Sequence, residues 1–303
     1  MAPTLRTPNA PRATSPVRGM VWMLVSGLNF VAVTAIVKHL GDAVPAAQAA
    51  FLRYVLGLVF LIPMIRPILD ARLTRRQISL FGLRGATHSI AVILWFFAMT
   101  RITIAEVTAM NYLSPIYVTL MAALLLKEGL PPRRIAAIGL AFIGALIILR
   151  PGFRTVEIGH LAMLGTALMF SFSYLSAKVM SDEVSATVVV GMLNITVTLG
   201  LLPFALAVWV TPSWADIGLL FLVACFATAG HYSMTFAFAS APLTVTQPVT
   251  FLQLIWAVSL GAFVFGEAVD VFVVMGGMLI LAAVLWLTWR EAQQRRLATQ
   301  TPS

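Results

Sequence analysis

The sequence predicts an all-α membrane protein whose ten transmembrane helices form two inverted five-helix repeats (5+5). Of its 303 residues, 60% are hydrophobic and 10% are charged, whereas a soluble domain has about 25% charged residues. A helix needs about 20 mostly apolar residues to cross a bilayer, and ten such windows lie between charges, Pro and Gly. Lipid offers no hydrogen-bond partner to an open strand edge, so every window is expected to be a helix.

The expected helices are 18–38, 45–65, 78–99, 103–126, 132–149, 157–179, 184–209, 215–238, 243–265 and 271–289. They group into a first unit, 18–150, and a second, 157–290. Residues 1–17 are rich in Pro, Thr and Ala, which is typical of a disordered tail. Residues 291–303 form a second tail, and both tails are expected in the cytoplasm for the reason that follows.

The cations of the loops predict the orientation. If the N-terminus is cytoplasmic, that side holds fourteen Lys and Arg residues, and the opposite side holds only Lys38, Arg101, Arg150 and Arg154. This asymmetry follows the positive-inside rule, so both termini are expected in the cytoplasm. The cations behind the formal charge of +9 are therefore explained by the orientation of the chain in the membrane, and no nucleic-acid partner is needed to explain them.

An internal repeat explains why two halves are expected to be inverted. A shift of about 140 residues aligns Lys38 with Lys178 and Pro63 with Pro203, and a shift of 139 aligns Glu128 with Glu267. Each unit contains five spans, so the second unit enters the membrane from the opposite side. Inverted repeats suit a carrier that opens one central site alternately to the two sides. The alternative is an old duplication that was retained only for packing.

Several residues carry a family resemblance. Pro115 in the fourth span and Glu128 at its end precede the run IAAIGLAFIGALIIL, and Glu267 and Gly276-Gly277 repeat the pattern in the second half. The second half departs from it at Leu254, which stands where Pro115 is expected. Across its whole length the chain resembles the EamA-type drug/metabolite transporter superfamily, and within it bacterial inner-membrane exporters of amino acids, aromatic ones included.

The resemblance implies a multi-pass secondary transporter of the bacterial inner membrane that exports small organic metabolites. Neutral or aromatic amino acids are the expected cargo, and a drug or another metabolite is the alternative. The expected partners are this small molecule and the lipid bilayer. A monomer is one of the states that the sequence allows.

Pro115 predicts a kink in span four. Proline removes one backbone donor and crowds the preceding turn, so the helix is expected to bend near Asn111 and free a carbonyl group. Asn111, Tyr112 and Ser114 are then expected to reach a central cavity. Glu128 and Glu267 are interpreted as structural, either as helix-end caps or as interhelical hydrogen-bond partners, and a transport role is the alternative.

Polar residues within other spans fall on shared helical faces, which are expected to line the bundle interior. Span three carries Arg84, His88, Trp95 and Met99 on one face. For each candidate the alternative is hydrogen bonding or packing between helices. The candidate substrate-binding residues are Asn29, His88, Trp95, Asn111, Tyr112, Ser114, Tyr174, His231, Thr250 and Gln253, with Pro115 at the kink.

Arg53 lies about eight residues into span two. Snorkelling, or an ion pair with Asp42 or Glu106, is the first interpretation, and binding of a substrate carboxylate is the alternative. All eleven acidic residues lie at or near span ends, which argues against a proton relay built on a buried carboxylate.

The sequence contains no P-loop, HExxH or GxSxG stretch, so neither ATP hydrolysis nor a hydrolase is expected. No cofactor and no metal are expected either. A membrane enzyme that uses His88 and His231 is the competing class of function.

The orientation is testable by cysteine labelling in intact cells after the single native cysteine, Cys225, has been replaced. A membrane-impermeant reagent is expected to label a cysteine in the 150–156 loop and to leave one in the 66–77 loop unlabelled. Labelling of the 66–77 loop from outside would reverse the assignment.

Overall fold

The computed structural model describes residues 15–125, 131–181, 183–241 and 243–300. Its elements are α1 (Pro16–Leu40), α2 (Ala46–Gly57), η1 (Leu58–Met64), α3 (Ile65–Asp70), α4 (Arg75–Met99), α5 (Ile104–Asn111), α6 (Ser114–Leu125), α7 (Pro132–Leu149), α8 (Ile158–Ser181), α9 (Ala186–Ala207), α10 (Trp214–Ser240), α11 (Leu243–Thr246), η2 (Gln247–Val249), α12 (Thr250–Phe265) and α13 (Val271–Gln300).

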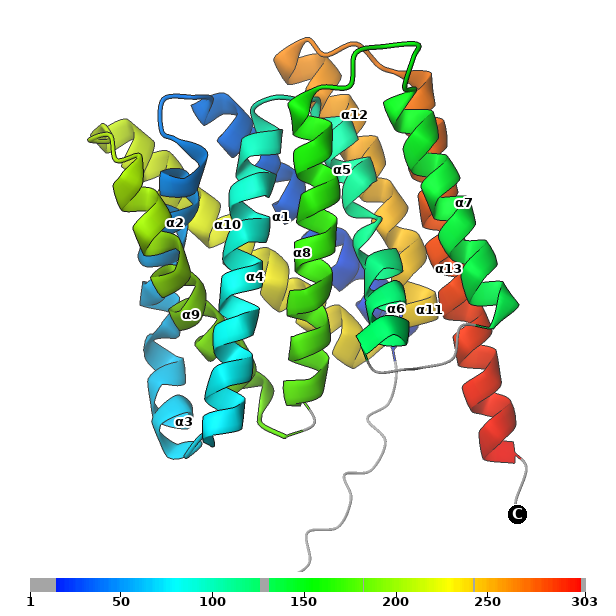
Figure 1. Cartoon of the computed structure of the whole chain (residues 1–303), viewed down its shortest axis with the longest axis horizontal. Helices are drawn as coiled ribbons and strands as arrows, with labels where there is room; N and C mark the ends of the chain where they lie inside the picture. The colour runs from blue at the N-terminus through cyan, green and yellow to red at the C-terminus, as the bar shows by residue number, and fades with distance from the viewer. Residues whose placement is uncertain (1–14, 126–130, 182, 242, 301–303) are drawn as a thin grey trace, which may run out of the picture.

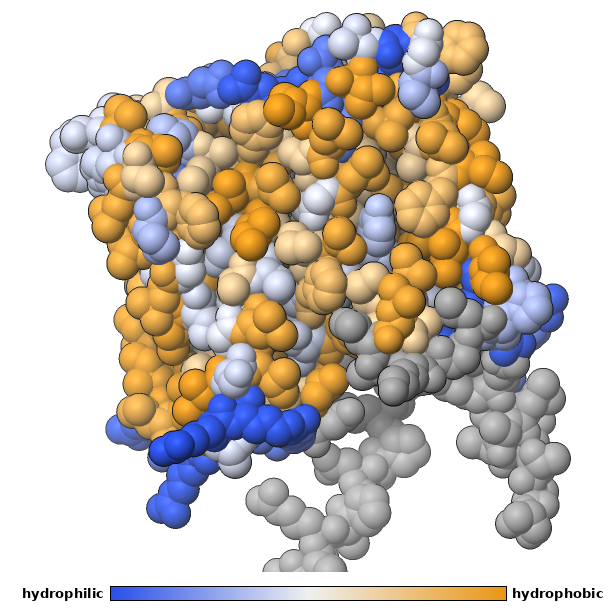
Figure 2. Space-filling model, in the orientation of Figure 1, coloured by the Kyte–Doolittle hydropathy of each residue, from blue (hydrophilic) through white to orange (hydrophobic). Residues whose placement is uncertain are grey.

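The protein is a bundle of ten spans that run between two ends (Figure 1). Eight of them are helices long and apolar enough to cross a membrane. The other two are span four, divided into α5 and α6, and span nine, divided into α11, η2 and α12. Hydrophobic side chains cover the middle of the visible face, and hydrophilic ones gather at its two ends (Figure 2). This pattern fits a multi-pass membrane protein.

Local sequence explains where the spans begin and break. Thr74 and Thr103 each form a capping box, with Gln77 and Glu106 respectively, and so satisfy backbone donors at the starts of α4 and α5. Span four is interrupted at residues 112–113, and Pro115 is the second residue of α6. A proline fits there because the first turn of a helix needs no donor. Span nine is interrupted over Gln247–Val249, a segment that contains Pro248.

The two halves are interleaved, because most helix contacts join one half to the other. Helix α1 of the first half packs on α10 of the second half. The symmetry-equivalent contact is that of α8, in the second half, with α4, in the first. Among the other contacts between the halves, α2 with α9, α5 with α12 and α7 with α13 pair equivalent spans, whereas α4 with α9 and its symmetry equivalent, α10 with α2, join non-equivalent ones. This pattern is that of two inverted repeats related by a pseudo-two-fold axis. Neither half forms a separate five-helix bundle.

Spans five and ten approach most closely at two glycines. A Cβ atom on Gly144 of α7 would lie 2.7 Å from the carbonyl oxygen of Gly276 in α13, and one on Gly276 would lie 2.5 Å from the carbonyl oxygen of Gly144. Figure 1 shows the two helices side by side. In lipid, where helices gain nothing from hiding apolar surface, small residues that admit such approach stabilise the pair.

This contact predicts a position-specific effect of adding one methyl group to α7. Gly144→Ala forces α7 and α13 apart and is expected to lower the free energy of unfolding by about 1–3 kcal/mol, as overpacking does elsewhere. Gly139→Ala is the matched control, because nothing lies within 4 Å of its added Cβ, and it is expected to be neutral or slightly stabilising. Denaturant titration in detergent micelles measures both, and equal stabilities would contradict the account.

Candidate functional site

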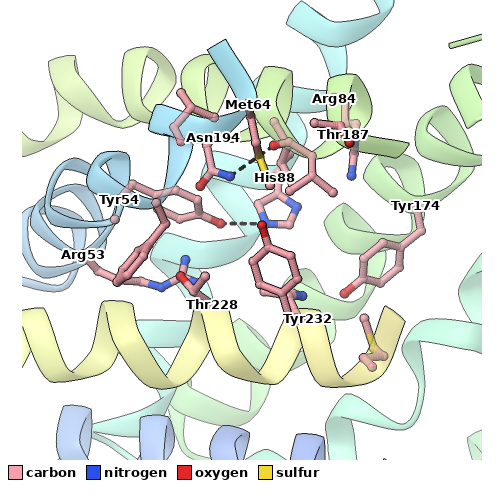
Figure 3. A pocket seen from close by; sticks show the side chains of 17 residues that line it. Arg53, Tyr54, Met64, Arg84, His88, Tyr174, Thr187, Asn194, Thr228 and Tyr232 are labelled. Atoms are coloured by element: carbon pink, nitrogen blue, oxygen red, sulfur yellow. Dashed lines mark hydrogen bonds between the residues drawn. The ribbon is translucent and has the colours of Figure 1, made fainter. Parts of the chain in front are cut away.

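A cavity of about 350 Å³ lies between α2, η1, α4, α8, α9 and α10, within the size range of small-molecule sites. It occupies the half of the bundle nearer α3, because its residues on α4, α9 and α10 lie towards the helix ends that meet there. We call this end of the bundle the α3 end. The side chains that give the cavity its chemical character are Arg53, Tyr54, Phe60, Arg84, His88, Tyr174, His231 and Tyr232 (Figure 3).

His88 is held in place from two sides. Its Nε2 lies 3.0 Å from the hydroxyl of Tyr54 on α2, and its Nδ1 lies 3.0 Å from Oγ of Ser173 on α8. Because a hydroxyl can donate or accept, both contacts are satisfied by a neutral imidazole. The Arg53 guanidinium carbon lies 4.3 Å from the centre of the Tyr54 ring. Tyr54 therefore connects the histidine to the arginine.

The two cations that lie within spans both line this cavity. Of the 20 Lys and Arg residues in the chain, Arg53 and Arg84 are the two outside the loops and span ends, and both are buried. Arg84 donates from Nη1 to the carbonyl oxygen of Val189, at 2.9 Å. No Asp or Glu is found among the described residues that line the cavity. A buried pair of cations without acidic partners is costly and is typical of a functional site.

The structure contradicts one part of the first interpretation of Arg53, its ion pair with Asp42 or Glu106. Asp42 pairs with Arg101, and Glu106 pairs with Arg154 and His160. Both acids lie at the end of the bundle opposite α3. The depth of Arg53 in span two excludes these pairings because its side chain points into the cavity (Figure 3).

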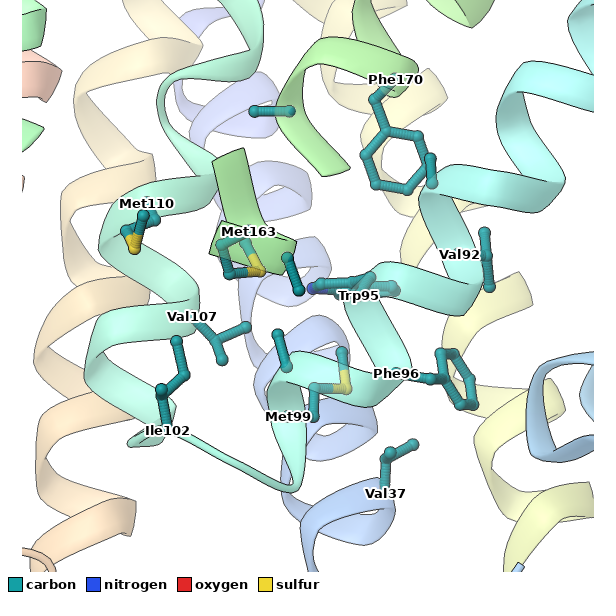
Figure 4. Packing of buried hydrophobic residues seen from close by; sticks show 14 of the residues in the cluster. Val37, Val92, Trp95, Phe96, Met99, Ile102, Val107, Met110, Met163 and Phe170 are labelled. Carbon is teal, nitrogen blue, oxygen red and sulfur yellow. The ribbon is translucent and has the colours of Figure 1, made fainter. Parts of the chain in front are cut away.

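The polar face of span three is divided between the cavity and the hydrophobic core. Arg84 and His88 line the cavity, whereas Trp95 and Met99 lie further along α4 in the packed core (Figure 4). Phe170 of α8 separates the two regions. Its ring centre lies 4.9 Å from that of His88 and 6.3 Å from that of Trp95, and it stacks on Tyr174 at 5.5 Å.

The candidates in span four lie outside this cavity. The Tyr112 hydroxyl donates to the carbonyl oxygen of Thr250 at 2.8 Å, and so joins the break in span four to the start of α12. The Ser114 hydroxyl lies 3.5 Å from Oδ1 of Asn111, and Pro115 is exposed. Direct contact between these residues and a substrate stays a prediction.

Two other candidates pack between helices. Asn29 donates to the carbonyl oxygen of Val25 in its own helix, at 2.7 Å. Gln253 lies against α1 beside Gly27, where an added Cβ would be 3.4 Å from the Gln253 Cβ. Of the ten candidates, the structure therefore brings His88, Tyr174 and His231 together around the cavity.

Sequence reasoning did not select several cavity residues. Tyr54, Phe60, Tyr232, Thr187 and Asn194 carry no signal that separates them from other polar or aromatic residues in spans. Arg84 had such a signal, because it is an intramembrane cation on the same helical face as His88.

Comparison with known proteins identifies the family. The model of the EamA-like transporter family matches residues 17–150 and again residues 157–289. The chain belongs to the EamA-like transporter family. It is accordingly a membrane transporter of small metabolites and not an enzyme, which removes the competing interpretation of His88 and His231 as catalytic groups.

Relatives of this EamA-like transporter carry different cargoes. It is 28% identical to a riboflavin transporter of Vibrio cholerae over 93% of this chain and 96% of that one. An S-adenosylmethionine uptake transporter of Rickettsia prowazekii is 23% identical over 90% and 93% of the two chains. A pseudopaline exporter of Pseudomonas aeruginosa is 22% identical over 89% and 95%.

A solved crystal structure shares the fold of the EamA-like transporter. Its TM-score is 0.61 with 17% sequence identity, and the match covers 93% of this chain and 99% of that one. At this identity the likeness concerns the fold alone.

Ion pairs join the two halves of the transporter at the end opposite the α3 end. Lys38 Nζ lies 2.6 Å from Glu267 Oε1, and Glu267 Oε2 accepts a hydrogen bond from the backbone N–H of Ile104 at 3.0 Å. Arg150 pairs with Asp270 across the same boundary. We propose a structural role for Glu267 on these contacts. Its repeat equivalent, Glu128, lies outside the described residues.

A smaller contact joins the halves at the α3 end. Arg76 Nη1 lies 2.6 Å from Glu183 Oε1, and the Gln77 side chain donates to Glu183 Oε2 at 3.0 Å. These two groups lower the pKa of the Glu183 carboxyl. The Arg76 side chain is 63% exposed, so this ion pair is expected to hold the halves together less strongly than the partly buried pairs at the other end do.

The Lys38–Glu267 pair is expected to contribute measurably to stability. Glu267→Gln leaves Lys38 without its counter-charge in a site where the two side chains are 19% and 11% exposed, and the expected loss is about 3 kcal/mol. Asp42→Asn is the control, because the Arg101–Asp42 side chains are 45% and 73% exposed and such pairs contribute about 0–1 kcal/mol. Unfolding in detergent measures both, and a change no larger for Glu267→Gln than for the control would contradict this role.

Proposed function

We propose that this transporter exports neutral amino acids with apolar or aromatic side chains across the bacterial inner membrane. The observation that carries the proposal is the cavity of about 350 Å³ between the halves, with its aromatic lining. Tyr54, Phe60, Tyr174 and Tyr232 supply broad apolar surfaces with a few polar groups, which is the usual composition of a site for a small organic molecule. Tyr174 and Tyr232 are 41% and 43% exposed, so their rings offer free surface to a bound group.

Alternating access supplies the transport step in this proposal. The cavity lies in the half nearer the α3 end, while partly buried ion pairs join the halves at the opposite end. Rocking of one half against the other breaks the Lys38–Glu267 and Arg150–Asp270 contacts and opens the cavity on that side. With both termini in the cytoplasm, the α3 end is cytoplasmic, and the conformation described is the one that loads cargo from inside the cell.

Proteoliposomes that contain only the purified protein test the function. Vesicles preloaded with unlabelled phenylalanine are expected to accumulate labelled phenylalanine, tyrosine or leucine by counterflow, and protein-free vesicles are the control. Counterflow of riboflavin or a drug-like cation, without counterflow of any amino acid, would overturn the amino-acid proposal. It would favour the alternative, an exporter of drugs or other metabolites.

The coupling of transport follows from the side chains inside the bundle. The described lining of the cavity contains two histidines, His88 and His231, and no carboxylate. Because imidazole is the side chain that most commonly shuttles protons in proteins, transport is expected either to follow the substrate gradient or to couple to protons through a histidine. A pH gradient is therefore expected not to drive accumulation once both residues are changed to Ala. Uphill transport by that double variant under a pH gradient would show a coupling group elsewhere.

A further inference from the structure

We infer that Arg53 is the centre of an anion-binding subsite that recognises the carboxylate of the transported molecule, and that an ammonium group on that molecule is not required. Arg84 lines the same cavity on the other side of His88 (Figure 3) and adds positive charge to it. The inference rests on the proposed function for the location of the substrate in this cavity. It goes further in naming the group that is recognised. The substrate class becomes organic carboxylates with an apolar or aromatic body, of which amino acids are one kind.

Both arginines have donors without partners. Arg53 and Arg84 are 7% and 6% exposed, and the buried Nε of each has no hydrogen-bond partner. Arg84 makes one hydrogen bond, to the carbonyl oxygen of Val189. For Arg53, the structure gives neither an ion pair nor a hydrogen bond with any described residue, and its contact is the face of the Tyr54 ring. Guanidinium donors therefore remain available on both side chains.

The described residues supply no counter-charge to the two arginines. The described lining of the cavity contains no carboxylate. Asp42 and Glu106, the acids considered as partners of Arg53 from the sequence, are paired with other cations at the end opposite α3. A charge moved out of water needs a partner or costs several kcal/mol. Since the described lining contains no acidic side chain, a bound anion is the group that completes the site.

The type and support of the two side chains favour a carboxylate. A guanidinium presents its donors in a planar fork that matches two carboxylate oxygens. The Tyr54 ring lies under the Arg53 fork at 4.3 Å, and the Tyr54 hydroxyl is bound to His88, which is bound in turn to Ser173. This chain of contacts across α2, α4 and α8 fixes Arg53 before a ligand arrives. A fixed fork loses less entropy on binding than a free one.

The same lining offers little to an ammonium group. Two guanidinium groups repel it, and hydroxyl or amide oxygens are the acceptors available in place of a carboxylate. A cation without an acid group is therefore expected to be excluded. An acid without an amine is expected to bind at least as tightly as the corresponding amino acid.

Four ligands that share a phenyl group test the inference by calorimetry on the full-length protein in detergent. They are L-phenylalanine, 3-phenylpropanoate, L-phenylalaninamide and 2-phenylethylamine. We expect the two acids to bind, and the amide and the amine to bind at least tenfold more weakly, a difference of about 1.4 kcal/mol. Equal binding of acid and amine, or the absence of binding by both acids, overturns the inference.

Variants then assign the effect to the two arginines. Arg53→Gln is expected to weaken 3-phenylpropanoate binding at least tenfold and Arg84→Gln to weaken it by a smaller factor, while the control Arg101→Gln, at a surface ion pair, leaves it unchanged. Arg53→Gln is also expected to raise the melting temperature, because it removes a buried charge without a partner. A variant that melts lower and binds normally would assign Arg53 a structural role and overturn the inference.

The two proposals fail in different ways. Normal phenylalanine counterflow by Arg53→Gln and Arg84→Gln would overturn the subsite and leave amino-acid export standing. Arginine-dependent binding of the acids, without counterflow of any amino acid, would support the subsite and overturn the export proposal.

Discussion

Lipid provides no hydrogen-bond partners, so every polar group of this chain must be satisfied within the bundle or placed at its ends. Continuous helices satisfy their own backbone, but spans four and nine are interrupted. The backbone groups freed at these two interruptions need hydrogen-bond partners from elsewhere in the protein. The Tyr112 hydroxyl supplies one of them by donating to the carbonyl oxygen of Thr250. The interleaving of the halves, in which α5 packs on α12, brings these two weak points together.

The same constraint sorts the charges. The acids that the structure describes lie at span ends, where Lys38, Arg101, Arg150 and Arg154 each pair with one of them. Arg53 and Arg84 are the exceptions, buried in the middle of the bundle beside a cavity. The ion pairs at the end opposite α3 hold the two halves together. Arg53 and Arg84 have no acidic partner among the described residues, so an anionic ligand could supply the counter-charge. In the proposed mechanism, transport follows when the ligand's carboxylate binds in the cavity and the contacts at the two ends of the bundle exchange.

The fold was largely predictable because each step rests on a strong physical signal. Apolar windows of the right length predicted ten spans, nine of them within about five residues of their observed bounds, and the odd number of spans in each repeat required inversion. The exception is α13, which continues to Gln300 and so includes most of the segment 291–303 that was expected to be a tail. The break in span nine was not predicted, because Leu254 occupies the position equivalent to Pro115. Pro248, six residues earlier, lies within the interruption instead.

The site was less predictable because periodicity identifies an inward face without distinguishing a cavity from a packed core. His88 and Trp95 share a face of α4, yet one lines the cavity and the other packs against Phe170. The proline in span four drew attention to Tyr112, whereas the cavity is formed by spans two, three, six, seven and eight. Arg84 was the better indicator of the cavity. An intramembrane cation without an acidic partner is costly and therefore indicates a functional site, whereas a polar or aromatic residue in a span is common.

A structure of the full-length protein determined with bound 3-phenylpropanoate tests the central claim most directly. The account predicts density for the ligand in the cavity, with its carboxylate within hydrogen-bonding distance of the Arg53 guanidinium group and its ring against Tyr174 or Tyr232. Ligand density at the breaks of spans four and nine, beside Tyr112 and Thr250, with the arginine cavity empty, would contradict it.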